Sequence, residues 1–172
     1  DIIVTQNGID FDLKWINTMF VKHGLKPVSP YKSVDTKRVL KSKFRFISNK
    51  LDFVGRKLGL GGKLSTGGFE LWEGCLKGDK KCWDKMLKYC KNDVILLEKL
   101  YLKVLPFISN HPNYGLYSGV SDSVCPNCGC KSLERRGFEY TSTNKYQRYV
   151  CKKCGKWSRE RKSIGKINVS GI

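Results

Sequence analysis

Two short stretches, Cys125-Pro-Asn-Cys128-Gly129 and Cys151-Lys-Lys-Cys154-Gly155, decide the fold of the C-terminal part of the chain. Within each stretch two residues separate the thiolates, so both can reach one tetrahedral ion, and the following glycine permits the turn. The 22 residues between the pairs leave room for a hairpin through 135–140 and 146–150. The pattern predicts a zinc ribbon that holds one structural Zn²⁺ and folds largely on metal-binding energy.

The remaining cysteines do not share this spacing. Cys130 matches neither pair, and Cys75, Cys82 and Cys90 are scattered without the spacing of a disulfide framework. A redox disulfide, or two unrelated thiol pairs, is the alternative to the zinc site. The paired spacing favours metal binding in a reducing compartment.

Aromatic and cationic residues are interleaved around the ribbon. Aromatic faces can stack on bases while cations follow a phosphate backbone, although ribbon aromatics equally often form the module's own small core. The sequence favours neither of these two alternatives. If the ribbon binds nucleic acid, the expected contacts are Arg148, Tyr149, Lys152 and Lys153.

The charge of the chain points to a polyanionic partner. Its 172 residues include 33 Lys and Arg against 15 Asp and Glu, a formal net charge of +18, and both sides of residue 120 are basic. Such a field favours nucleic acid, with a lysine-rich solubility surface as the alternative. The chain has no apolar run of roughly 20 residues and no secretory signal at its start, so we expect a cytoplasmic protein without membrane association.

Alternating strand and helix patterns precede the ribbon. Residues 2–4 predict a strand, 13–20 a helix, 33–35 a second strand, 36–40 a short helix and 51–58 another helix. The glycine-rich stretch 59–68 lacks the Gly-Lys-Ser/Thr ending of a phosphate loop, so we expect a flexible surface loop whose Lys63 could touch a phosphate. The longest helix is expected over 82–105, with an apolar stripe of Met86, Cys90, Val94, Leu97, Tyr101 and Val104.

Two acidic positions stand where an element could present them to a metal. Asp12 follows Asn7-Gly8-Ile9-Asp10-Phe11 at the mouth of a helix, and Tyr89 and Asp93 share one helical face beside the apolar stripe. Each has an ordinary structural interpretation, because Asp12 could cap its helix and Tyr89 and Asp93 could form a solvated pair.

Taken together, these residues resemble a known family. Asn-Gly-x-x-Phe-Asp at 7–12, followed some eighty residues later by Tyr-x-x-x-Asp at 89–93, resembles the second and third motifs of the DEDD superfamily of 3′–5′ exonucleases, in its tyrosine-bearing branch. The similarity covers about residues 1–105 and implies a ribonuclease H-like α/β fold. The whole layout, ribbon included, resembles ribonuclease H-like proteins common in phages and bacteria, which implies a bacterial cell or a phage-infected host.

The resemblance implies roles for individual residues. Asp12 and Asp93 would be carboxylate ligands of a two-metal Mg²⁺ or Mn²⁺ site, and Tyr89 would orient the attacking water. Asn7 would stabilise the turn and, with Phe11, contact nucleic acid. The family's first motif, Asp-x-Glu on the first strand of the sheet, has no counterpart ahead of Asp1. We therefore expect that the sequence is truncated. A split gene completed by a companion chain and a degenerate binding protein are the alternatives. We also expect little activity from the isolated chain.

These observations predict a mixed α/β ribonuclease H-like domain lacking its first strands over 1–108, a linker over 109–123, a zinc ribbon over 124–160 and a basic tail over 161–172. The expected function is phosphodiester hydrolysis of DNA or RNA by a 3′–5′ exonuclease. A non-catalytic nucleic-acid-binding module and an assembly adaptor whose ribbon binds protein are the alternatives.

Overall fold

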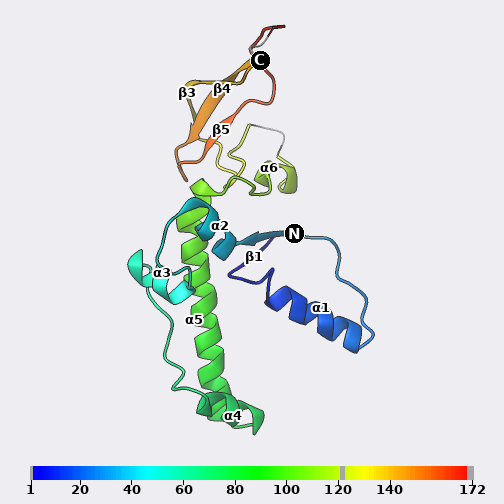
Figure 1. Cartoon of the computed structure of the whole chain (residues 1–172), viewed down its shortest axis with the longest axis vertical. Helices are drawn as coiled ribbons and strands as arrows, with labels where there is room; N and C mark the ends of the chain where they lie inside the picture. Colours follow the sequence, from blue (N-terminus) through cyan, green and yellow to red (C-terminus); the bar gives the residue numbers. More distant parts are fainter. Residues whose placement is uncertain (1, 121–122, 170–172) are drawn as a thin grey trace. The chain divides into compact units, whose positions relative to one another are not determined.

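The computed structural model describes residues 2–120 and 123–169, which form two compact units divided after Val104. Figure 1 shows the elements of both units. Each unit is described by itself. Among the described residues, no helix is both long enough and apolar enough to cross a bilayer.

The N-terminal unit starts with a small parallel sheet. β1 (Ile2–Thr5) is followed by α1 (Asp12–Lys22), β2 (Lys32–Asp35) and α2 (Thr36–Lys43), and β1 pairs with β2 from Ile2 beside Lys32 to Thr5 beside Asp35. Because the strands are parallel, both end at the same edge of the sheet. The loop after β1 and the start of α2 therefore meet there.

Three helices complete this unit. These are α3 (Leu51–Lys57), α4 (Glu70–Leu76) and the long α5 (Lys80–Val104), and both α2 and α3 pack against α5. Leu40, Val54 and Leu100 are fully buried where they meet. Near the start of α5, α4 packs through Leu71 and Cys75 on Met86 (Figure 1). The mixed α/β fold expected from the sequence is confirmed, although α4 was not foreseen.

The buried stripe of α5 differs from the expected one. Its buried residues are Met86, Leu96, Leu100 and Val104, whereas Cys90 and Val94 are exposed. The observed spacing passes through positions 89 and 93, so Tyr89 and Asp93 lie within the buried stripe rather than beside it. The prediction considered only apolar residues, whereas the polar residues Tyr89 and Asp93 lie in the middle of the buried face of α5.

Helix α1 presents its apolar side chains to solvent in this structure. It has no buried residue, and Trp15, Ile16 and Met19 are exposed. Within the described residues, the edge of β1 away from β2 has no partner strand. This apolar helix and open strand edge contrast with the packed interface between α2, α3 and α5.

The C-terminal unit is built on an antiparallel sheet. It contains η1 (Leu105–Phe107), α6 (Tyr114–Tyr117), β3 (Leu133–Tyr140), β4 (Asn144–Cys151), β5 (Trp157–Arg159) and β6 (Gly165–Lys166). The predicted hairpin corresponds to β3 and β4, and β5 and β6 both pair with β4. The 109–123 segment thus includes a helical turn, and residues 165–166 of the 161–172 tail form β6.

A buried carboxylate fixes the loop after β1. Asp35 is only 4% exposed and caps α2, its Oδ1 accepting hydrogen bonds from the backbone nitrogens of Lys37 at 2.9 Å and Arg38 at 3.3 Å. The same carboxylate accepts from the backbone nitrogens of Asn7 at 3.0 Å and Ile9 at 3.2 Å. One side chain therefore joins the end of β2 to the loop that carries Asn7.

We expect Asp35→Ala to lower the free energy of unfolding of the N-terminal unit by about 2–4 kcal/mol, because several backbone donors lose a charged acceptor. Urea titration followed by tryptophan fluorescence measures this, since Trp15, Trp72 and Trp83 all lie in this unit. Asp10→Ala is the control: Asp10 forms an exposed ion pair with Arg38 and should matter little. Equal effects of the two substitutions would contradict the proposed anchor.

Candidate functional site

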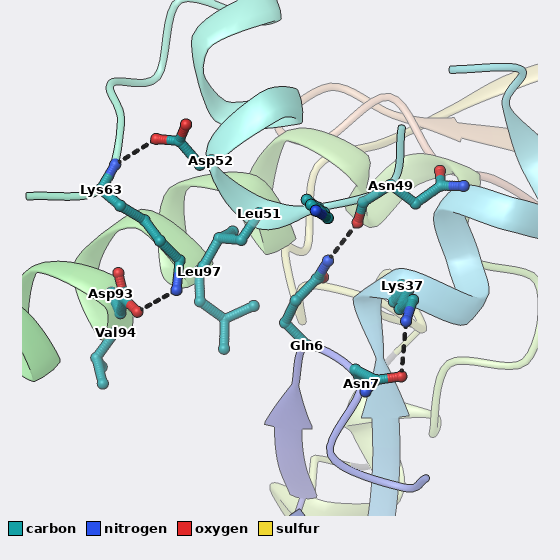
Figure 2. A pocket seen from close by; sticks show the side chains of 11 residues that line it. Gln6, Asn7, Lys37, Asn49, Leu51, Asp52, Lys63, Asp93, Val94 and Leu97 are labelled. Carbon is teal, nitrogen blue, oxygen red and sulfur yellow. Dashed lines mark hydrogen bonds and ion pairs between the residues drawn. The ribbon is translucent and has the colours of Figure 1, made fainter. Parts of the chain in front are cut away.

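A pocket of about 490 Å³ lies at the carboxyl end of the N-terminal sheet. Figure 2 shows its lining, which comes from the loop after β1, from the 49–52 segment, from Lys63 and from α5. Gln6 and Asn7 form one side and Asp93 the other, with Leu51 and Leu97 between them. The pocket therefore combines a polar rim with an apolar floor, which is typical of ligand sites.

The Asn7 side of the pocket is held in a fixed conformation. Asn7 has a backbone φ of +70°, a left-handed conformation that asparagine tolerates better than most residues. Its Oδ1 accepts a hydrogen bond from Lys37 Nζ at 3.0 Å, and Gln6 Nε2 donates to the Asn49 carbonyl at 2.8 Å (Figure 2). The sequence-based expectation that Asn7 lies in a turn agrees with this geometry.

Three side chains meet on the Asp93 side. Lys63 Nζ lies 2.5 Å from Asp93 Oδ2 and donates a hydrogen bond to the Tyr89 hydroxyl at 3.0 Å. The other carboxylate oxygen, Asp93 Oδ1, is buried and has no hydrogen-bond partner among the residues that the structure describes. Burial lowers the pKa of Lys63, but the hydrogen bonds to Asp93 and Tyr89 outweigh it and raise the pKa overall.

The glycine-rich segment is anchored at the residues that deliver Lys63. The Lys63 backbone nitrogen donates to Asp52 Oδ1 at 2.7 Å, and Asn92 Nδ2 donates to the Gly62 carbonyl at 3.1 Å. Hydrogen bonds from Arg56 and from the Lys63 backbone lower the pKa of Asp52. The segment is therefore held in place, not the flexible loop that its glycines predicted. Its partners Asp52 and Asn92 are distant in sequence and give no local signal.

The predicted catalytic residues are not all brought into the pocket. Asp93 lines it, and Tyr89 joins it through Lys63. Asp12 is exposed at the first turn of α1, and neither it nor Phe11 lines the pocket. Phe11 occupies the N-cap position of α1, and no side-chain hydrogen bond caps this helix. The alternative interpretation of Asp12 as a helix cap is therefore wrong.

The donor chemistry at Asp93 suits a hard divalent cation. A carboxylate oxygen that is buried and lacks a hydrogen bond is costly unless something satisfies it, and oxygen is the ligand that Mg²⁺ and Mn²⁺ prefer. Among the described residues, Asp12 and Asp93 do not belong to any group of three or more acidic, histidine or cysteine ligands. Asp93 thus fits as one ligand of a site that needs further oxygens.

The second candidate site is the cysteine cluster of the C-terminal unit. The sulfur atoms of Cys125, Cys128, Cys151 and Cys154 all lie within 4.8 Å of one another. Cys125 Sγ and Cys154 Sγ are 3.6 Å apart, as are those of Cys128 and Cys151. A tetrahedral zinc ion with Zn–S bonds of about 2.3 Å requires sulfur separations of about 3.8 Å. The four cysteines could therefore hold zinc.

The backbone around the cluster supports the same interpretation. Gly129 and Gly155, which follow the two pairs, have φ of 70° and 76°, the conformation for which glycine was expected. The remaining neighbour, Cys130, stays outside the cluster, and its sulfur accepts a hydrogen bond from the Ser132 nitrogen at 3.4 Å. The cluster thus has four thiols with ribbon geometry and excludes the fifth.

The thiols of the cluster differ in acidity. Burial raises the pKa of Cys128, and the neighbouring thiols of Cys154, Cys125 and Cys151 raise it further. Burial also raises the pKa of Cys151, but backbone donors at Cys154 and Lys153 outweigh it and bring the pKa to about 7. A cation that binds here must therefore displace thiol protons.

The expected nucleic-acid contacts of the ribbon do not share one surface. Arg148 and Tyr149 are neighbours on β4, so their side chains point to opposite faces of the sheet. Tyr149 donates its hydroxyl hydrogen to Glu160 Oε1 at 2.7 Å. Lys152 and Lys153 are exposed in the turn between the last two cysteines. Arg148 and Tyr149 therefore cannot contact the same ligand side by side.

We expect Lys63→Met to lower the free energy of unfolding by about 1 kcal/mol at neutral pH, because Asp93 loses a partly screened ion pair. Since folding raises the pKa of Lys63 above its ordinary 10.5, the contribution is complete below that value and is lost as the pH rises through the raised pKa. Urea titrations at pH 7 and at about pH 11 measure the difference. Lys99→Met replaces an exposed lysine on α5 and should show no such pH dependence. The same pH dependence in both variants would contradict the proposed contribution of the Lys63–Asp93 ion pair.

Comparison with known proteins identifies the N-terminal unit. Searches of curated proteins and of solved structures gave no significant match. A family model described as the RNase_H superfamily matches residues 1–105, which include the parallel sheet, the pocket and the whole of α5. The match supports nuclease-type activity on nucleic acid. Over residues 1–105, the chain belongs to the RNase_H superfamily.

Proposed function

We propose that the N-terminal unit is the metal-dependent part of a 3′–5′ exonuclease that hydrolyses phosphodiester bonds. The observation that carries the proposal is Asp93 at the rim of a pocket in a ribonuclease H-like unit, where its buried Oδ1 has no hydrogen-bond partner within the described part of the chain. The Tyr-x-x-x-Asp spacing of the tyrosine-bearing exonucleases adds Tyr89 on the same helical face. A half-buried polar pair inside an apolar stripe is costly to keep without a function.

The residues of the pocket have distinct proposed roles. Asp93 and Asp12 serve as metal ligands, and two divalent ions, when bound, would stabilise the entering and leaving oxygens of an in-line displacement. Because the Tyr89 oxygen accepts a hydrogen bond from Lys63, its own hydrogen points elsewhere and can orient a water. Asn7 contacts substrate from the opposite side of the pocket. Asp12 and Asp93 supply two carboxylates, and the full metal site needs more.

Non-catalytic nucleic-acid binding is the second candidate function, and a specific observation favours it. In the cysteine-containing unit, two arginine side chains lie over aromatic rings of the ribbon sheet, Arg148 over Trp157 and Arg159 over Tyr146. Such pairs suit a phosphate-bearing, base-containing ligand whether or not hydrolysis occurs. We propose that Zn²⁺ at the four cysteines stabilises this sheet.

The nuclease proposal is tested with the protein produced from the complete reading frame that contains this sequence. Asp93→Ala should reduce Mn²⁺-dependent release of 3′-terminal nucleotides by more than about 100-fold, because a metal ligand is lost. Release is measured on labelled DNA and RNA oligonucleotides by denaturing gel. Glu98→Ala, an exposed carboxylate change on the same helix, is the matched control and should retain activity. If Asp93→Ala retains the unaltered rate, its proposed role is wrong.

The zinc proposal predicts one zinc per chain. Cys128→Ser should lose most of the bound zinc and the dispersed NMR signals of β3 and β4, because a ribbon of this size depends on metal for folding. Metal content is measured by atomic emission after dialysis. Cys130→Ser is the matched control, because Cys130 lies outside the cluster, and it should keep both zinc and signals. Equal zinc loss in both variants would refute the four-cysteine assignment.

A further inference from the structure

The sheet of the C-terminal unit has two chemically different faces. In an antiparallel sheet, directly opposed residues share a face, and so do residues two apart on one strand. The pairs Arg148–Arg159, Val150–Trp157 and Glu139–Tyr146 place one set of side chains together. We call this set, Tyr146, Arg148, Trp157 and Arg159, the arginine face.

Two arginines on the arginine face lie over aromatic rings. The Arg148 guanidinium is 4.7 Å from the centre of the Trp157 ring, and the Arg159 guanidinium is 4.1 Å from that of Tyr146. Trp157 nevertheless remains 50% exposed. The face therefore offers two guanidinium planes that lie over aromatic rings, and of these rings Trp157 is exposed to a ligand.

Further contacts hold both guanidinium groups in place. Arg148 Nε donates to the Arg136 carbonyl at 3.1 Å, and Arg159 Nη1 forms an ion pair with Glu139 at 2.9 Å. These bonds reduce the side-chain entropy that a ligand would otherwise have to remove. Lys166 of β6 is opposed to Asn144 and so adds a third cation to the same face. The arginine face thus carries three cations against two carboxylates, Glu134 and Glu139, and its guanidinium groups are preorganised.

The opposite face is already used by the unit itself. The Tyr149 hydroxyl is bonded to Glu160, and a pocket on this side is lined by Tyr149 together with Leu116 and Val124 from the segment before the first cysteine. Farther along, Lys145 lies 4.0 Å from the centre of the Phe138 ring, beside the exposed Tyr140. Intramolecular contacts therefore occupy much of this face.

We propose that the arginine face binds single-stranded nucleic acid, with bases stacking on Trp157 and Tyr146 and phosphates contacting Arg148, Arg159 and Lys166. The inference deepens the nucleic-acid function proposed above and rests on it for the class of ligand. Unpaired bases expose the π-faces that such a surface can stack on, whereas a duplex hides them between neighbouring base pairs. The proposal replaces Tyr149, on the other face, with Trp157 as the central aromatic contact.

The test uses the full chain, loaded with zinc, and fluorescein-labelled 15-mers of dT and of U, with a duplex of equal length as competitor. We expect Trp157→Ala to weaken single-strand binding about 10-fold in fluorescence anisotropy, the effect of losing one stacked base. Arg148→Gln should reduce the slope of log affinity against log salt by about one, because one phosphate contact is lost. Trp157→Ala should leave that slope unchanged.

Tyr140→Ala is the matched control, because Tyr140 is a 68% exposed aromatic on the opposite face of the same sheet. It should bind with wild-type affinity. Zinc content and NMR spectra of each variant exclude unfolding as the cause of any loss. Equal weakening by Trp157→Ala and Tyr140→Ala, or binding of the duplex as tightly as the single strand, would overturn the proposal, as would Trp157-dependent binding of polyglutamate with similar affinity.

Failure of this inference can be told apart from failure of the nuclease proposal. If Asp93→Ala abolishes nucleotide release while Trp157→Ala leaves single-strand affinity unchanged, the nuclease proposal holds and the arginine face is wrong. If Trp157→Ala weakens single-strand binding while Asp93→Ala retains nucleotide release, the arginine face holds and the nuclease proposal is wrong. The two substitutions lie in different compact units, so each readout reports on its own site.

Discussion

The buried carboxylate of Asp35 is the interaction on which the N-terminal site depends. Its oxygens accept hydrogen bonds from the start of α2 and from the loop after β1, so they satisfy donors that would otherwise be unpaired in a buried place. Without this bridge, the left-handed turn at Asn7 would lose its backbone hydrogen bonds to the start of α2 and keep only side-chain contacts such as that from Lys37. At the carboxyl edge of the two parallel strands, Asp35 joins the loop to the helix through the backbone of both, and Lys37 adds a side-chain contact.

A related constraint shapes the other side of the pocket. Tyr89 and Asp93 occupy positions on α5 that its packing would assign to apolar residues, and Lys63 supplies the charge and hydrogen bonds that make this tolerable. Of the two Asp93 carboxylate oxygens, Lys63 satisfies only Oδ2. The anchoring of residues 62–63 by Asp52 and Asn92 explains how a glycine-rich segment can place a lysine at that point.

The sequence was informative where signals are local. The spacing of the four cysteines and the glycine after each pair allowed the cluster and its hairpin to be foreseen, since each feature depends on a few adjacent residues. Where the determinant is tertiary, prediction was poorer. The stripe of α5 was misplaced because its true face includes polar residues, and the partners of Asp35 and Lys63 lie about thirty residues away in the chain. The relation of Asp12 to Asp93 remains a prediction.

The position of Cys151 at the end of β4 has a further consequence. A strand alternates sides at every residue, so the direction that carries this sulfur into the cluster also determines which way Arg148 points, three residues earlier. The cysteine cluster therefore determines which side chains of β4 lie on each face of the sheet. Inserting or deleting a single residue between Arg148 and Cys151 would move each preceding side chain of β4 to the opposite face of the sheet. We therefore expect this stretch to tolerate substitution far better than any change in length.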